Sequence, residues 1–116
     1  MKTLFILNDP PYGTERSYNG LRLATSLSKR DGESVRVFLM GDAASVAKAG
    51  QKLPDGYYNL ERMLKALAVA GGEIGVCGTC MDARGLAPGE LVDAARKSTL
   101  AELTDWSQWA DTVLVF

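Results

Sequence analysis

The sequence predicts an α/β fold, namely a three-layer α/β/α sandwich around a mostly parallel sheet of about five strands. The first observation is that short apolar runs alternate along the chain with segments whose apolar residues recur at helical spacing. The second is that the run at 2–8 is almost continuously apolar, as in a strand covered on both faces. This alternation is typical of a parallel sheet with helices on both of its faces.

The first third of the chain predicts a strand, a helix and a second strand. We expect the strand at 2–8 to be central in the sheet, and a loop with two prolines and a glycine follows it. A helix begins at Thr14 or Glu15 and carries apolar residues at helical spacing, namely Tyr18, Leu21, Ala24 and Leu27. It ends at 29–32, where basic residues precede a glycine, and the next strand covers 34–40.

The middle of the chain carries the strongest helical pattern. Good helix formers bracketed by glycines predict a short helix over 41–50, and a flexible connection follows at 51–56. At 58–70 the apolar residues form one stripe, which we interpret as core packing. The members of this stripe are Leu60, Met63, Leu64, Leu67 and Ala68. Gly71 and Gly72 then end the helix and lead into a third strand.

The last third predicts a short strand, a helix and a closing strand. The segment after the next turn is ambiguous between one helix and a strand at 94–98, and we favour the strand. A helix follows over 99–110, with Ser98 or Thr99 as its N-cap. The apolar run at 111–116 predicts a final strand.

Size and charge exclude several classes of function. A chain of 116 residues fits one domain, 1–116, and leaves enough exposed surface that self-association is a reasonable expectation. The formal net charge is −1 and the basic residues are dispersed, so no nucleic-acid partner is predicted. No apolar run approaches about 20 residues, and the short run at 4–7 is unlike a secretory signal. We therefore expect no membrane partner and a cytoplasmic protein with reduced thiols.

The topology itself predicts where a site lies. In sheets of this class, ligands bind beyond the carboxyl ends of the strands. Three segments reach that edge, at 8–12, 40–42 and 77–80. The candidate pocket residues from these segments are Asn8, Asp9, Tyr12, Gly41, Gly78 and Thr79. Asparagine, aspartate and proline after a strand are also ordinary loop formers, so a structural role for the first segment stays open.

The segment 73–85 contains both cysteines of the chain. An apolar strand ends at Cys77, and Thr79 has the form of a helix N-cap with an acidic residue three positions later, which places Cys80 at the first helical position. A thiol near a helix N-terminus is favoured as thiolate. Arg84 follows one helical turn after Cys80, where its guanidinium can lie near the sulfur or bind an anion. This reasoning favours Cys80 as the more acidic thiol.

Other interpretations of the cysteines remain. They can be small buried packing residues, or a dithiol of the thioredoxin type, although that motif is expected earlier in its domain. One Cys-x-x-Cys pair in a chain without histidine cannot close a tetrahedral zinc site, so we predict no metal. The glycines form neither a dinucleotide-binding pattern nor a P-loop, so no cofactor is predicted.

The chain resembles the DsrE/DsrF-like family, in the group of small YchN-like proteins. The resemblance covers nearly the whole chain and is most specific at 77–86, 98–103 and 110–116. It implies an α/β/α sandwich that assembles into homotrimers or homohexamers, with members that act in sulfur relay by carrying a persulfide on a cysteine at the end of the third strand. By counting back from Arg84, the resemblance places that cysteine at Cys77, with Cys80 as an addition.

The leading hypothesis is a sulfur-carrier protein, and possible sulfurtransferase, that binds sulfane sulfur as a cysteine persulfide and passes it from a protein donor to an acceptor. The candidate catalytic residues are Cys77, Cys80 and Arg84, with Cys80 as second acceptor or resolving thiol. Two alternatives are a non-catalytic oligomeric module that binds a small anion or a partner, and a dithiol redox switch. A second thiol can resolve a persulfide by forming a disulfide and releasing sulfide.

Overall fold

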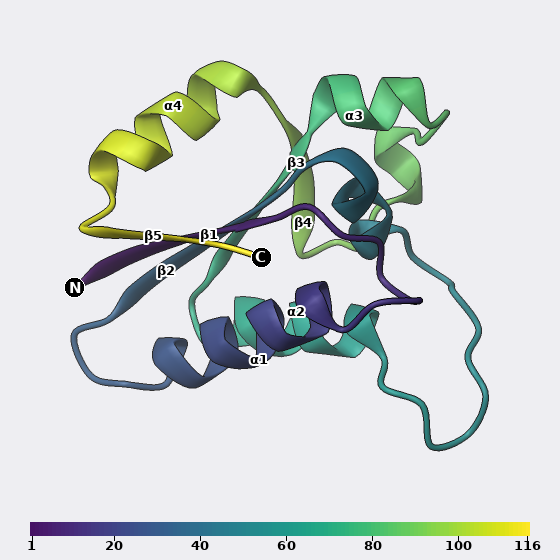
Figure 1. Cartoon of the computed structure of the whole chain (residues 1–116), viewed down its shortest axis with the longest axis horizontal. Coiled ribbons are helices and arrows are strands. Elements are labelled where there is room, and N and C mark those ends of the chain that lie inside the picture. Colours follow the sequence, from purple (N-terminus) through teal and green to yellow (C-terminus); the bar gives the residue numbers. More distant parts are fainter.

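Five parallel strands form one sheet in the order β4-β3-β2-β1-β5, in a computed structural model that describes residues 1–116 (Figure 1). The elements in chain order are β1 Lys2–Leu7, α1 Arg16–Ser28, β2 Ser34–Leu39, the 3-10 helix η1 Gly41–Ala47, α2 Leu60–Val69, β3 Glu73–Cys77, α3 Gly78–Ala83, the 3-10 helix η2 Pro88–Glu90, β4 Ala95–Ser98, α4 Leu100–Trp109 and β5 Thr112–Val115. The predicted α/β class with helices on both faces is confirmed.

The strand order corrects one prediction. The first strand was expected at the centre, but β2 occupies that position and β1 lies between β2 and β5. From β1 to β4 the chain moves in one direction across the sheet, and α4 then carries it back to the opposite side of β1. Because parallel crossovers are right-handed, this reversal puts α4 on the opposite face from α1 and α2, as Figure 1 shows.

Alternate residues of the three inner strands, β1, β2 and β3, face two separate cores. The larger core lies under α1, α2 and η1 and takes Phe5 and Val37 from the sheet. The smaller core lies under α4, where Phe38 packs edge-on against Trp106 with ring centroids 6.0 Å apart. Gly75 lies beside that pair, and a Cβ there would come within 3.2 Å of Trp106. The apolar pattern of the inner strands thus reflects burial on both faces.

Two N-caps set the helix boundaries. Asn59 accepts the backbone N–H of Arg62 at 3.1 Å, so α2 begins at Leu60 rather than at the predicted residue 58. Thr99 accepts the N–H of Glu102 at 3.2 Å and is the cap of α4. The ambiguous segment before it forms strand β4, as favoured. No helix combines the length and the apolar character needed to cross a lipid bilayer.

Candidate functional site

Strand β3 passes directly into helix α3 at Cys77, without an intervening loop. Cys77 has a non-helical backbone conformation, φ −56° and ψ 115°, and its Sγ accepts the backbone N–H of Cys80 at 3.4 Å. Cys77 is therefore the N-cap of α3, and Cys80 is the third helical residue. This corrects the predicted cap at Thr79 and the predicted first helical position for Cys80.

The environment of Cys77 favours its thiolate. Burial raises the pKa of the Cys77 thiol, but hydrogen bonds from the side chains and backbones of Cys80 and Thr79 outweigh burial and hold the pKa below its ordinary value. The hydroxyl of Thr79 lies 3.4 Å from the Cys77 sulfur. Donors directed at a sulfur stabilise its charged form, and the thiolate is the nucleophilic form of cysteine.

Cys80 has the opposite tendency. Burial and the hydrogen bond with Cys77 raise the pKa of the Cys80 thiol, and the charge of Cys77 acts in the same direction. The backbone of Gly41 and the charge of Arg84 lower that pKa, but by less than burial and Cys77 together raise it. The two thiols therefore differ in acidity in the order opposite to the one that helix position alone suggested.

Arg84 is occupied by protein groups. Its guanidinium donates to Oδ1 of Asp42 through Nη2 at 2.7 Å and Nε at 3.2 Å, and through Nη1 to the carbonyl oxygen of Cys80 at 3.1 Å. Asp42 lies in η1, so the pair joins η1 to the end of α3. Arg84 lies near Cys80, as predicted, but an acidic side chain compensates its charge.

A cavity of about 540 Å³ opens beside Cys77, between α3 and the start of α4. Its lining residues are Phe38, Met40, Cys77, Gly78, Thr79, Cys80, Asp82, Lys97, Ser98, Thr99 and Leu100. Four predicted site residues meet here, namely Cys77, Gly78, Thr79 and Cys80. The sequence reasoning missed Lys97, although a strand at 94–98 in a parallel sheet would have delivered it to this same edge.

Three residues predicted for the substrate pocket lie outside the cavity at Cys77. Their side chains instead form hydrogen bonds that stabilise the loop after β1. The side chain of Asn8 donates to the carbonyl oxygen of Phe116 at 3.3 Å. Asp9 accepts the hydroxyl of Thr14 at 2.8 Å. Tyr12 accepts the N–H of Leu60 through its hydroxyl at 3.2 Å. None of the three lines the cavity at Cys77.

Gly41 also lies outside the cavity lining, but its backbone acts on Cys80 as described above. It adopts φ 54°, a left-handed conformation that glycine tolerates best, at the point where β2 turns into η1. A Cβ at this position would lie 3.8 Å from the carbonyl oxygen of Asn8. The first two predicted segments therefore meet at Asn8 and Gly41, and Met40 is the one residue of the two that lines the cavity.

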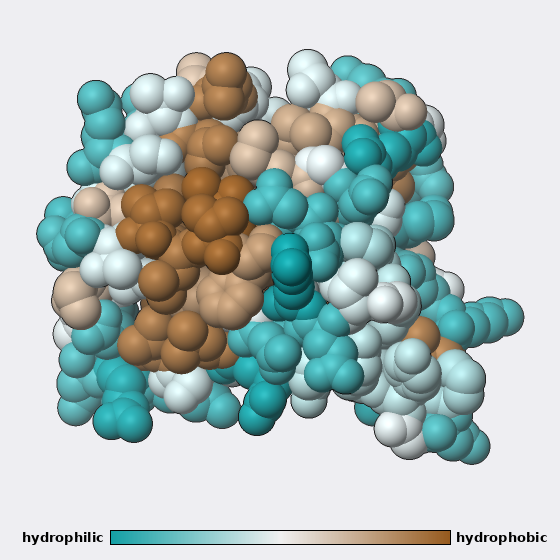
Figure 2. All heavy atoms as spheres, in the orientation of Figure 1, coloured by the Kyte–Doolittle hydropathy of each residue, from teal (hydrophilic) through white to brown (hydrophobic).

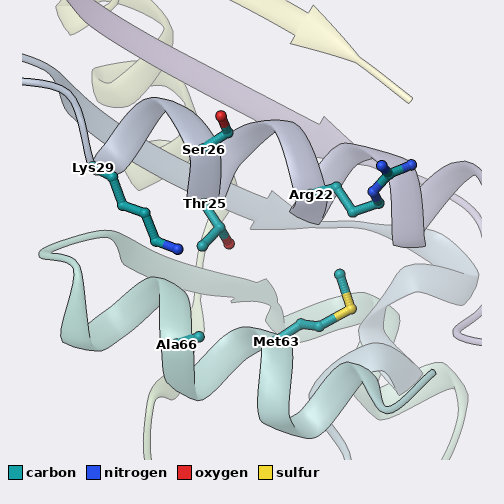
Figure 3. Close-up of a pocket in the computed structure, with 6 residues that line it drawn as sticks. All are labelled: Arg22, Thr25, Ser26, Lys29, Met63 and Ala66. Carbon is teal, nitrogen blue, oxygen red and sulfur yellow. The ribbon is translucent and has the colours of Figure 1, made fainter.

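A second hollow of about 320 Å³ lies between α1 and α2 (Figure 3). Its lining residues are Arg22, Thr25, Ser26, Lys29, Met63 and Ala66. Figure 3 shows Lys29 and Arg22 toward its two ends, with Thr25 between them and Met63 reaching up from α2. It contains no thiol and no carboxylate, whereas both thiols of the chain line the first cavity.

Fold and site together define a small parallel α/β protein with a cysteine site at the carboxyl edge of its sheet. The model of the DsrE/DsrF-like family matches residues 1–116, and the chain belongs to that family. Protein YchN of Escherichia coli (strain K12) is 39% identical over 116 residues, covering 99% of this chain and 98% of YchN. The uncharacterized protein MJ0989 of Methanocaldococcus jannaschii is 34% identical and covers 100% of both chains.

Solved structures extend the comparison to the fold. The crystal structure of the YchN protein from E. coli has a TM-score of 0.93 and covers 99% of this chain and 98% of its own. The protein of unknown function MTH1491 from Methanobacterium thermoautotrophicum has a TM-score of 0.78 at 10% identity, with coverage of 99% and 98%. At that identity the second match shows a shared fold alone.

Proposed function

We propose that this protein carries sulfane sulfur as a persulfide on Cys77 and passes it to a partner. The observation that carries the proposal is the pair of hydrogen bonds that hold the Cys77 sulfur at the end of β3, facing an open cavity. A thiolate stabilised in this way is a nucleophile within reach of solvent. Membership in a family that is associated with sulfur relay supports the same function.

The transfer needs no external oxidant or reductant. The Cys77 thiolate attacks the outer sulfur of a donor persulfide, R–S–S⁻, and forms a new S–S bond. The bond between that sulfur and the donor breaks, and the donor leaves as R–S⁻. An acceptor thiolate then attacks the outer sulfur of Cys77–S–S⁻ in the same manner, which restores the Cys77 thiolate. We propose that donor and acceptor are proteins.

Cys80 supports a second candidate function, a dithiol switch. Its contact with Cys77 favours attack of the Cys80 thiolate on Sγ of a Cys77 persulfide, which forms the Cys77–Cys80 disulfide and expels sulfide, HS⁻. The raised pKa keeps Cys80 mainly as thiol at neutral pH and slows this step. The proposed carrier therefore holds its sulfur long enough to meet an acceptor.

Mass spectrometry after incubation with thiosulfate tests the carrier function. We expect the wild-type chain and Cys80→Ser to gain the mass of one sulfur atom on Cys77, and Cys77→Ser to gain none. The same Cys80→Ser chain unfolded in urea is the control, because it keeps the thiol and loses its hydrogen bonds. Sulfur on neither cysteine, on Cys80 alone, or equally fast on the unfolded chain would exclude the proposal.

We also propose that the protein self-associates through the outer side of β5. Figure 2 shows a hydrophobic patch over β5 and the adjoining part of α1. In β5, Val113 and Val115 are 42% and 65% exposed, and Leu23 of α1 is 41% exposed. β5 is an edge strand, so one side of its backbone is unpaired as well. A second copy of the chain would cover apolar side chains and strand edge together.

A further inference from the structure

The cavity at Cys77 contains one cationic side chain, Lys97, and one acidic side chain, Asp82. Arg84, the cation that the sequence predicted for the site, is not among its lining residues and is paired with Asp42 at 2.7 Å. Lys97 is therefore the one positively charged side chain in the lining that an anion entering the cavity can contact.

The stem of Lys97 packs against the residue that follows the nucleophile. It lies in β4, which is paired with β3, and its stem crosses the backbone of Gly78, the residue after Cys77. A Cβ on Gly78 would lie 3.0 Å from Cε of Lys97, so there is no room between them for another group. The ammonium reaches Asp82 of α3, and Lys97 lines the same cavity as Cys77.

The Lys97 ammonium is available to a ligand. Its Nζ donates to Oδ1 of Asp82 at 2.9 Å, and the two side chains are 37% and 66% exposed. Ion pairs this exposed contribute little to stability, so a ligand can replace the carboxylate at small cost. A lysine ammonium has three donors on a flexible stem, and Asp82 uses one of them here.

Resting on the carrier function proposed above, we propose that Lys97 binds the negative charge of the sulfur donor in place of Asp82, so that the site selects anionic sulfane-sulfur compounds. With thiosulfate as donor, the Cys77 thiolate attacks the outer sulfur and forms Cys77–S–S⁻. The S–S bond of thiosulfate breaks, and sulfite leaves with the bonding electron pair. Lys97 lies where it can neutralise the entering anion beside an anionic nucleophile.

Competition between two alkylating reagents tests this role. Iodoacetate and iodoacetamide react with the same thiolate and are nearly equal in size, so the ratio of their rates reports the local charge and cancels the thiolate fraction. In a Cys80→Ser background, we expect Lys97→Met to lower the iodoacetate-to-iodoacetamide ratio at Cys77 about threefold at low salt. Lys97→Met keeps the apolar stem over Gly78 but leaves Asp82 without its cation, so the comparison is repeated in an Asp82→Asn background, where only the Lys97 charge differs.

Three controls sharpen the result. Lys65→Met removes a lysine that also pairs with one carboxylate, Glu61 at 3.5 Å, and should leave the ratio unchanged. Lys97→Arg should retain the ratio, and salt near 0.5 M should reduce the difference between Lys97→Met and its parent. An unchanged ratio in Lys97→Met, or an equal drop in Lys65→Met, would overturn the role of Lys97.

The reagent test is independent of sulfur transfer. A second arm measures persulfide formation from thiosulfate, which Lys97→Met should slow by a similar factor. If no variant takes up sulfur but the ratio shifts as expected, the carrier function fails and the anion site stands. If Lys97→Met and its parent take up sulfur equally fast, the carrier function stands and the proposed role of Lys97 in selecting anionic donors is overturned.

Discussion

The backbone N–H of Cys80 donates to the thiol sulfur of Cys77 at 3.4 Å, which makes one cysteine the N-cap of the helix that carries the other. The two thiols of one Cys-x-x-Cys motif are thereby unequal acids. The pKa of Cys77 is lowered by donors from Cys80 and Thr79 against the effect of burial, whereas burial and the Cys77 sulfur raise the pKa of Cys80.

This inequality predicts two separate pH profiles. A lowered pKa means that Cys77 is deprotonated at a lower pH than an ordinary thiol, and a raised pKa means the reverse for Cys80. In brief alkylation of the wild-type chain by iodoacetamide, followed for each cysteine by peptide mass spectrometry, Cys77 should reach half its maximal rate at a lower pH than Cys80. Coincident profiles for the two cysteines would show that the N-cap geometry does not control acidity.

Thr79 contributes part of the effect. Replacement by valine removes the hydroxyl next to the Cys77 sulfur, so the pKa of Cys77 should rise and its alkylation at pH 7 should slow about threefold. Thr104→Val is the matched control, because the Thr104 hydroxyl donates to a carbonyl oxygen within α4. Equal rates in Thr79→Val and its parent would contradict the assigned hydrogen bond.

Removal of Arg84 should affect one thiol only. Its positive charge lowers the pKa of Cys80 and is not among the causes that act on Cys77. Arg84→Gln should therefore slow alkylation of Cys80, measured in a Cys77→Ser background, and leave Cys77 unchanged in a Cys80→Ser background. Arg62→Gln, on the exposed side of α2, controls for the loss of one charge. Slower alkylation of Cys77 in Arg84→Gln would contradict this prediction and show that Arg84 also acts on the Cys77 thiolate.

Gly78 allows α3 to pack against β4. A Cβ at Gly78 would lie 2.8 Å from the carbonyl oxygen of Ser98, a backbone atom that cannot turn aside. Gly78→Ala should lower the free energy of unfolding by about 1–3 kcal/mol, as overpacking does elsewhere. Gly89→Ala has no neighbouring atom within 4 Å and serves as the control in the same urea titration. Similar stabilities for the two variants would contradict the close approach.

Glu102 should make stability depend on acid pH. The guanidinium of Arg96 and the hydroxyl of Ser98 lower the pKa of the Glu102 carboxyl against the effect of burial. A lowered pKa stabilises the fold above the pKa of the unfolded chain, and this stabilisation is lost as the pH falls through the folded value. Glu102→Gln should therefore be less stable at pH 7 by about 1 kcal/mol and closer to wild type at pH 3.

Urea unfolding at the two pH values measures this effect. Glu15→Gln is the control, because the structure assigns no hydrogen bond or ion pair to the side chain at the N-cap of α1. A loss of stability in Glu102→Gln that is equally large at pH 3 and pH 7 would be inconsistent with a role for the carboxylate charge.

The proposed self-association predicts the effect of a charge on β5. Val115 is 65% exposed, so Val115→Glu should leave the monomer folded while placing a carboxylate in the hydrophobic patch. We expect light scattering to give a smaller mass for Val115→Glu than for wild type. Val69→Glu, at an 89% exposed site on α2, is the control. A monomeric wild-type chain would exclude the proposal.

Local sequence patterns predicted much of the fold. The apolar stripe from Leu60 to Leu67 correctly predicted helix α2, and Thr99 with Glu102 correctly predicted the N-cap of α4. The apolar run before Cys77 gave β3, so the thiol was placed correctly at the carboxyl edge of the sheet. These predictions succeeded because periodicity and capping depend on residues within one or two turns of each other.

The sequence by itself thus determined the alternation of strands and helices and brought Cys77 to the end of β3, because these features follow from short-range patterns. Only the tertiary structure decided that β2 rather than β1 is central, and that Lys97 rather than Arg84 faces the cavity. The reason is that strand order and ion pairing depend on residues far apart in the chain, such as Arg84 with Asp42. The cap at Cys77 is local, but it depends on β3 entering α3 without a loop, at a point where Gly78 lies against the backbone of Ser98 in β4.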